Sequence, residues 1–119
     1  MLLRDQHAEE AVRLHEIPNL VRNFAQAVAQ RIGDRAGHWI TLNEPHIIAY
    51  EGYLHGQKAP GKRDATLIAP VSHHLLLGHG LAVQALRSVL SPTTRVGITL
   101  NVSPIEPVTD RAEDDEAAR

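Results

Sequence analysis

The sequence HWITLNEP, residues 38–45, gives the strongest indication of how this chain folds. Residues 38–42 are rich in β-branched and aromatic side chains, and Pro45 ends the run, so the pattern predicts a short strand over residues 38–42. The near-continuous apolar character is typical of a strand in a parallel sheet, where both faces are covered. We therefore expect a buried parallel strand here.

Upstream of this strand, apolar residues recur at helical spacing as far as Ile32. Pro18 suits the first turn of a helix, and Gly33 suits a left-handed cap that ends it. The pattern therefore predicts a helix over residues 18–32.

Residues 1–17 fit this pattern poorly. The most they indicate is a weak helix from Ala8 to Leu14, with Val12 and Leu14 as its apolar side. We therefore expect a divergent or poorly ordered N-terminal segment, 1–17, ahead of a domain over residues 18–119.

Downstream, residues 45–63 predict a long connection, because glycine and proline punctuate them (Gly52, Gly56, Pro60 and Gly61). A second apolar stripe predicts a helix over about residues 65–90, in which Pro70 produces a kink or marks the true start. Asp64 is the expected N-cap of this helix.

The remaining segments predict a second strand over residues 95–101 and a final helix that begins near Thr109 or Asp110. Asp110 and Glu113 have the spacing of a capping box. The order of elements is helix, strand, long loop, helix, strand and helix start. This alternation predicts an α/β fold built from parallel βαβ units.

Composition excludes several classes of protein. The chain has 119 residues, a formal net charge of −2 and no cysteine, which argues against a nucleic-acid surface, a disulfide framework and a thiolate metal site. The N-terminus lacks the apolar run of a signal peptide, and no stretch approaches the length of a membrane-spanning helix. We expect a soluble cytoplasmic protein with no membrane or nucleic-acid partner.

Glu44 is the first candidate for chemistry, because it follows directly on the predicted buried strand. In α/β barrels that end of a strand carries the active site. The barrel rim can shield a carboxyl there from water, which favours the protonated form that a general acid requires. Asn43 beside it offers an amide, which can both donate and accept a hydrogen bond. Taken alone, Asn-Glu-Pro is more often a strand-terminating turn.

Other polar and aromatic residues have simpler explanations. His73, His74 and His79 lie on a predicted helix at spacings that suit no metal site, and helix packing accounts for them better. Trp39, on a predicted buried strand, is more often a core residue than a platform for a ligand. For Tyr53, and for Gln57 in the same loop, loop packing is at least as good an explanation as a contact with a ligand.

The wider set of motifs resembles glycoside hydrolase family 1, the β-glucosidase type. HWITLNEP is followed by Gly52-Tyr53, Gly56 and Ala59-Pro60-Gly61. Three further motifs occur in the family's order, and the resemblance covers residues 19–119: RIGDR (31–35), HHLLLGHGLAV (73–83) and VGITLN (96–101).

The resemblance implies a segment of a (β/α)8 TIM barrel, with about two βα units around barrel strands 4 and 5. It implies hydrolysis of β-glycosides with retention and a β-glucoside or oligosaccharide substrate. We expect no cofactor and no metal. Glu44 takes the role of general acid/base, and Asn43 that of a sugar contact. The resemblance places Asn101 on the aglycone side.

Several features depart from the family. Retention needs a second carboxylate about 5–5.5 Å from the first, and none of the acidic residues after the second strand has the family's nucleophile context. A complete barrel needs about 250 residues, so 119 residues predict an incomplete barrel. His46 stands where the family often has Trp, and Pro70 is also unusual.

Two hypotheses follow from these features. The first is a β-glucosidase-type hydrolase of which this chain carries the acid/base half and is inactive alone. The second is a non-catalytic remnant that acts as a self-associating or interaction module, because unpaired strand edges recruit other chains.

Overall fold

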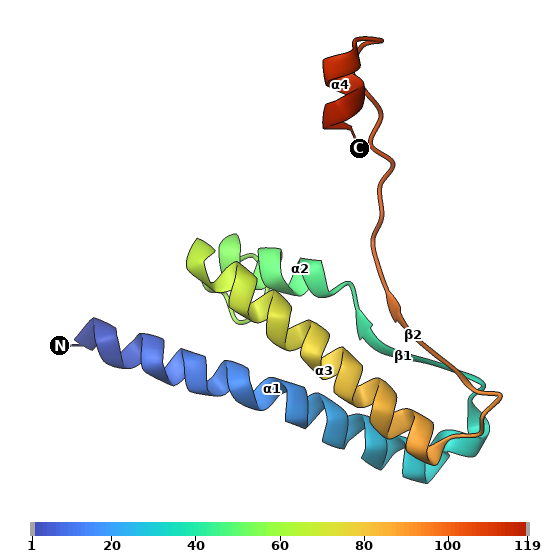
Figure 1. Ribbon diagram of the computed structural model, residues 1–119. Coiled ribbons are helices and arrows are strands. Elements are labelled where there is room, and N and C mark those ends of the chain that lie inside the picture. Colours follow the sequence, from blue (N-terminus) through green and yellow to red (C-terminus); the bar gives the residue numbers. More distant parts are fainter. Residues whose placement is uncertain (1, 119) are drawn as a thin grey trace.

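The computed structural model describes the backbone of residues 2–118 and the side chains of residues 13–118 (Figure 1). The elements are, in order, α1 (Leu2–Ile32), a 3-10 turn (Gly33–Arg35), β1 (His38–Asn43), α2 (Pro45–Ala49), a π-helical turn (Tyr50–Leu54), a 3-10 turn (Ala65–Leu67), α3 (Ile68–Val89), β2 (Arg95–Thr99) and α4 (Ala112–Ala117).

The two strands form a parallel sheet, as the alternation of helices and strands predicted. Strand β1 includes Asn43 in addition to the predicted residues, and β2 ends at Thr99 instead of residue 101. The register is regular from His38, opposite Arg95, to Ile40, opposite Gly97. Asn43 then pairs with Thr99, so β1 carries one more residue than β2 over this interval. The strand β1 therefore contains a β-bulge next to its C-terminal end.

Helix α1 is much longer than the sequence predicted. It runs without interruption from Leu2 to Ile32, and Pro18 lies inside it, so the assignment of Pro18 to a first turn is wrong. The expected divergent segment is helical from residue 2, and Leu14 is buried against α3 and α2. The side chain of Val12 lies outside the described residues. Packing outweighs the hydrogen bond that a proline in a helix forfeits, since Pro18 is buried where Gly78 of α3 lets the two helices approach closely.

Gly33 has a different role from the predicted left-handed cap. It opens the 3-10 turn that follows α1 and has no positive φ. A Cβ at this position would lie 2.6 Å from Cδ2 of Leu90. The glycine is therefore required by tertiary packing against the end of α3.

The start of α3 agrees with the sequence. Asp64 caps the 3-10 turn Ala65–Leu67 that leads directly into α3: its Oδ1 accepts a hydrogen bond of 2.9 Å from the Thr66 backbone N–H. Pro70 falls in the first turn of α3, so it marks the start of the helix and produces no kink in its middle. The preceding connection is shorter than predicted, because residues 45–54 form α2 and the π-helical turn.

Helices α1 and α3 lie side by side, run in the same direction and cover one face of the sheet (Figure 1). One apolar cluster joins Leu14 of α1 to Ala49, Tyr53, Val71 and Leu75. A second joins Ala29 of α1 to Leu86 and Leu90, with Trp39 and Val96 from the two strands packed against it. These two clusters form the core.

The segment Ala65–Val89, which contains α3, is long and apolar enough to cross a membrane by length and composition. The sequence expectation that no stretch approaches that length is therefore wrong. Core helices of soluble proteins meet the same criterion. Helix α3 packs against α1, β1 and β2, as a helix that covers a parallel sheet does.

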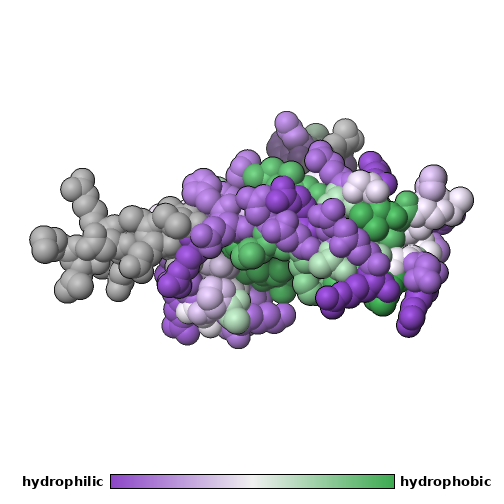
Figure 2. Space-filling model, turned by 90° about the horizontal axis from the view of Figure 1, so that it is seen from below, coloured by the Kyte–Doolittle hydropathy of each residue, from purple (hydrophilic) through white to green (hydrophobic). Residues whose placement is uncertain are grey.

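The opposite face of the sheet is not covered, contrary to the expectation of burial on both faces. Ile40 of β1 is 62% exposed. The Cα radius of gyration is 18.2 Å, whereas a compact chain of this length has about 13–14 Å. Figure 2 shows hydrophobic surface between hydrophilic side chains on the face of the molecule seen from below.

The C-terminal part extends away from the helices and the sheet and ends in α4 (Figure 1). The predicted capping box is absent, because α4 begins at Ala112 and its N-cap is Arg111. Thr109 Oγ1 donates a hydrogen bond to Asp114 instead. Residues 101–111 are exposed.

Candidate active site

Glu44 lies at the junction between β1 and α2, one residue past the strand. Its backbone N–H donates a hydrogen bond of 2.9 Å to Thr99 O at the end of β2, and its carbonyl accepts one of 2.9 Å from the Ile47 N–H. Pro45 follows as the first residue of α2 and is buried. The backbone of Glu44 is therefore tied to both the sheet and the helix.

The backbone conformation of Glu44 is left-handed, with φ 47° and ψ 63°. Among the described residues it is the one non-glycine residue with positive φ. An L-residue in this region costs about 1–2 kcal/mol, and such strain is concentrated at functional sites. The side chain is half-buried.

The bulge in β1 decides which way the last residues of the strand face. Trp39 and Thr41 face the helices, as alternation requires, and Leu42 also packs toward the cluster around Leu14. Two successive residues thus point to the helices, and Asn43 is exposed. Without the bulge, alternation would place Asn43 on the helix side and Leu42 in solvent.

The other predicted sugar contact, Asn101, lies two residues past β2 and is exposed. Since the strands are parallel, Asn101 and Glu44 both follow the C-terminal end of a strand at the same edge of the sheet. The structure thus brings the ends of the two strands together through the bond from Glu44 to Thr99, while Asn101 lies in the extended segment beyond.

The aromatic candidates belong to the core. Trp39 packs against the cluster of Ala29, Leu86 and Leu90, and its Nε1 donates a hydrogen bond of 3.1 Å to Ala36 O. This confirms the interpretation of Trp39 as a core residue. Tyr53 is 9% exposed and belongs to the other cluster.

Gln57 and His46, the remaining candidates near Glu44, are both exposed. The backbone N–H of Gln57 donates a hydrogen bond of 2.8 Å to Glu51 O, and His46 lies in α2. The structure gives neither side chain a partner that would assign it a role.

His74 and His79 pair with other groups of the protein. His74 is buried; its Nδ1 lies 2.7 Å from Pro70 O, and its Nε2 lies 3.0 Å from Nδ1 of His15 on α1. Within residues 13–118, no group of three potential ligands could hold a metal ion.

His79 Nδ1 lies 2.6 Å from Thr41 Oγ1 on β1. Sequence reasoning missed this last pair, since 38 residues separate its members.

The comparisons with known proteins agree with this arrangement. The model of the family described as glycosyl hydrolase family 1 matches residues 13–119, which is most of the chain. This chain belongs to glycosyl hydrolase family 1.

Curated family 1 relatives include a 1,4-β-D-glucan glucohydrolase of Thermotoga neapolitana, 36% identical over 104 residues, and a β-glucosidase of Arabidopsis thaliana, 38% identical over 117 residues. Each alignment covers 87% of this chain, and 24% and 23% of the respective relative. The chain therefore spans about a quarter of the length of the curated relatives it matches.

Solved family 1 structures match the fold as well. A β-glucosidase from Thermotoga maritima superimposes with a TM-score of 0.79 at 35% identity, over 87% of this chain and 23% of that chain. A rice β-glucosidase gives a TM-score of 0.74 at 33% identity, over 82% and 23%. The T. maritima enzyme has also been solved with deoxynojirimycin bound. The predicted fold, a segment of a (β/α)8 barrel, is confirmed.

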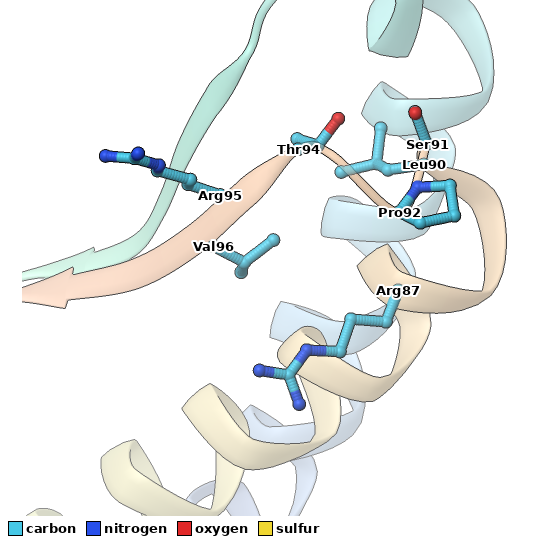
Figure 3. A pocket seen from close by; sticks show the side chains of 7 residues that line it. All are labelled: Arg87, Leu90, Ser91, Pro92, Thr94, Arg95 and Val96. Atoms are coloured by element: carbon cyan, nitrogen blue, oxygen red, sulfur yellow. The ribbon is translucent and has the colours of Figure 1, made fainter.

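A cavity of about 520 Å³ lies at the other end of the sheet, between the end of α3 and the start of β2 (Figure 3). Arg87 of α3 and Arg95 of β2 line it, and their guanidinium groups extend away from the Ser91–Pro92 turn. Because family 1 barrels, like other (β/α)8 barrels, carry their chemistry at the C-terminal ends of the strands, we do not assign this cavity to the active site.

Proposed function

We propose that this chain contributes to the hydrolysis of β-O-glycosidic bonds with retention, as in a β-glucosidase, and that Glu44 is its general acid/base. The observation that carries the proposal is the position of Glu44 in a family 1 chain. It follows the C-terminal end of a parallel strand, which is where (β/α)8 barrels hold their catalytic groups.

The geometry suits the proposed role of Glu44. The backbone is held by hydrogen bonds to Thr99 and Ile47, so the half-buried carboxyl projects from a fixed point of the fold. In the first step of a retaining reaction such a carboxyl protonates the leaving oxygen. In the second step it takes a proton from the water that attacks the glycosyl-enzyme intermediate.

Asn43 is the proposed sugar contact. The bulge turns it away from the helices and it is exposed, so its amide is available as donor and acceptor for a sugar hydroxyl. Asn101, beyond the neighbouring strand, is the proposed contact on the aglycone side. The substrate class is a β-glucoside or an oligosaccharide with a β-linked terminal sugar.

We further propose that the chain alone is inactive. Retention requires a second carboxylate about 5–5.5 Å from the first. The acidic residues after β2 lie in the extended segment and in α4, away from the strand ends (Glu106, Asp110, Glu113, Asp114, Asp115 and Glu116). The segment thus supplies one half of the catalytic pair.

The test is a chimera in which residues 13–119 replace the matching segment of the T. maritima β-glucosidase. General-acid assistance matters most when the leaving group is poor. Glu44→Gln should therefore lower kcat/KM for methyl β-glucoside by about 10²–10⁴-fold, and much less for 2,4-dinitrophenyl β-glucoside, whose leaving group needs no proton. Glu51→Gln, which changes a nearby carboxylate in the π-helical turn, is the matched control and should leave both substrates unaffected.

Two results would contradict the proposal. One is an unsubstituted chimera that folds but hydrolyses neither glucoside. The other is an equal loss on both substrates in Glu44→Gln, because that indicates a role unrelated to leaving-group protonation. For the chain alone, turnover of a chromogenic β-glucoside that disappears in Glu44→Gln would overturn the claim of inactivity.

The uncovered face of the sheet favours a second candidate function, a self-associating module. Exposed apolar side chains occur on β1 and along the C-terminal segment (Ile40, Leu100, Val102, Ile105 and Val108). A sharp oligomeric peak in gel filtration supports this candidate. A monomer, or aggregation without a defined size, argues against it.

A further inference from the structure

A β-bulge lies next to the C-terminal end of β1, directly before the proposed catalytic residues. The bulge sends both Thr41 and Leu42 to the helix side and so turns Asn43 to the opposite side. A strand that lost this bulge would exchange the faces of Leu42 and Asn43. Whatever stabilises the bulge therefore also sets the direction of Asn43 and of Glu44 after it.

The side chain of Thr41 connects the bulge to α3 and to β2. Its Oγ1 lies 2.6 Å from His79 Nδ1 on α3 and donates a hydrogen bond of 3.2 Å to Gly97 O on β2. One hydroxyl therefore links the helix to both strands at the position where the ladder is irregular.

Only one assignment of protons makes both contacts of Thr41 Oγ1 hydrogen bonds. A threonine hydroxyl has a single proton to donate, and here it goes to Gly97 O, which can only accept. His79 must then donate from Nδ1 to Thr41 Oγ1. The result is a continuous chain of hydrogen bonds, from His79 Nδ1–H through Thr41 Oγ1–H to Gly97 O.

His79 offers a rigid anchor for this chain. It lies in the middle of α3, next to the buried Gly78. At that position α3 is pressed against α1, since a Cβ on Gly78 would lie only 3.3 Å from the Cα of Pro18. The imidazole is itself half-buried, so its place relative to the strands is set by helix packing.

We propose that His79 and Thr41 are positioning residues, which lock the bulge of β1 and thereby hold Glu44 at the edge of the active site. This inference rests on the proposed role of Glu44 as acid/base. Neither residue touches the substrate in this proposal. They act through the backbone, and the bond from the Glu44 N–H to Thr99 O reports on their effect.

The first test uses the unsubstituted chain of 119 residues. ¹⁵N NMR of the His79 ring, recorded above neutral pH, should show a proton on Nδ1. A bare Nδ1 would overturn the proposal, because Thr41 would then donate to His79 and the link to Gly97 would be lost.

The second test measures amide hydrogen exchange of Glu44 against that of Leu90, whose N–H bonds to Leu86 O in the core. Thr41→Val keeps the side-chain shape but removes the hydroxyl. It should raise the Glu44 rate about five- to tenfold and leave Leu90 unchanged. Thr41→Ser, which restores the hydroxyl, should return the Glu44 rate to within about twofold of the original. Thr94→Val is the matched control, since Thr94 precedes the other end of β2.

The outcomes separate positioning from general stability. Equal acceleration at Glu44 and Leu90 would make Thr41 an ordinary stabilising residue and overturn the proposal, as would an unchanged Glu44 rate. If Thr41→Val does not fold, the His79 tautomer in the unsubstituted chain decides. Neither the tautomer nor the exchange rate depends on glycoside hydrolysis. A failure of the positioning role of His79 and Thr41 can therefore be distinguished from a failure of the acid/base assignment of Glu44.

Discussion

The left-handed backbone of Glu44 predicts that removing its Cβ stabilises the fold. Glu44→Gly and Glu44→Ala both delete the carboxyl, but only the alanine keeps a Cβ at φ 47°. The left-handed conformation costs an L-residue about 1–2 kcal/mol. Glycine avoids this cost but lowers the stability by about 0.5–1 kcal/mol, because the unfolded chain with glycine has greater conformational entropy. Glu44→Gly should therefore be about 0.5–1 kcal/mol more stable than Glu44→Ala.

Urea unfolding followed by circular dichroism at 222 nm measures this difference, as a shift of the midpoint at constant slope. The same pair of substitutions at Glu51 is the control. Glu51 lies in a helical turn and has no positive φ, so Glu51→Gly should be less stable than Glu51→Ala by about 1 kcal/mol. An equal or lower stability of Glu44→Gly relative to Glu44→Ala would refute the argument from strain.

Three further predictions concern the packing that supports the site, and each is measured by the same unfolding titration. Leu86 is 1% exposed between the helices and the sheet, so Leu86→Ala should cost about 2–5 kcal/mol. Leu76→Ala, at a position 53% exposed, should cost far less, and equal losses would contradict the assigned core. Asp64→Ala should cost about 1 kcal/mol through loss of the cap on Thr66, whereas Asp64→Asn should retain most of it. Gly33→Ala should cost about 1–3 kcal/mol because its Cβ would meet Leu90. Adding Leu90→Ala should make the loss less than additive, and strict additivity would rule out that contact.

Local patterns predicted much of the fold and the place of the candidate acid. The apolar run before Glu44 predicted β1, the stripe after Asp64 predicted α3, and the alternation of elements predicted parallel pairing. Glu44 could be located because the predicted strand ends directly before it, and neighbouring residues are enough to set the end of a strand. These features depend on neighbouring residues, which is the information that periodicity and capping carry.

The contacts that orient the site are not local, and the sequence did not reveal them. Pro18 looked like a helix start because a proline inside a helix forfeits a backbone hydrogen bond, yet packing against Gly78 keeps α1 continuous. Gly33 was predicted to be a left-handed cap, but its lack of a side chain instead leaves room for Leu90.

The amino-acid sequence is enough to place an acidic residue at the end of a parallel strand in a chain of glycosyl hydrolase family 1. How that residue is held follows from the tertiary structure. The bulge of β1, the left-handed turn at Glu44 and the link from Thr41 to His79 depend on groups from three elements that meet in space. A periodic pattern in the sequence cannot predict such contacts, because the hydrogen-bonded groups are far apart along the chain. Packing of the helices on the sheet brings them together.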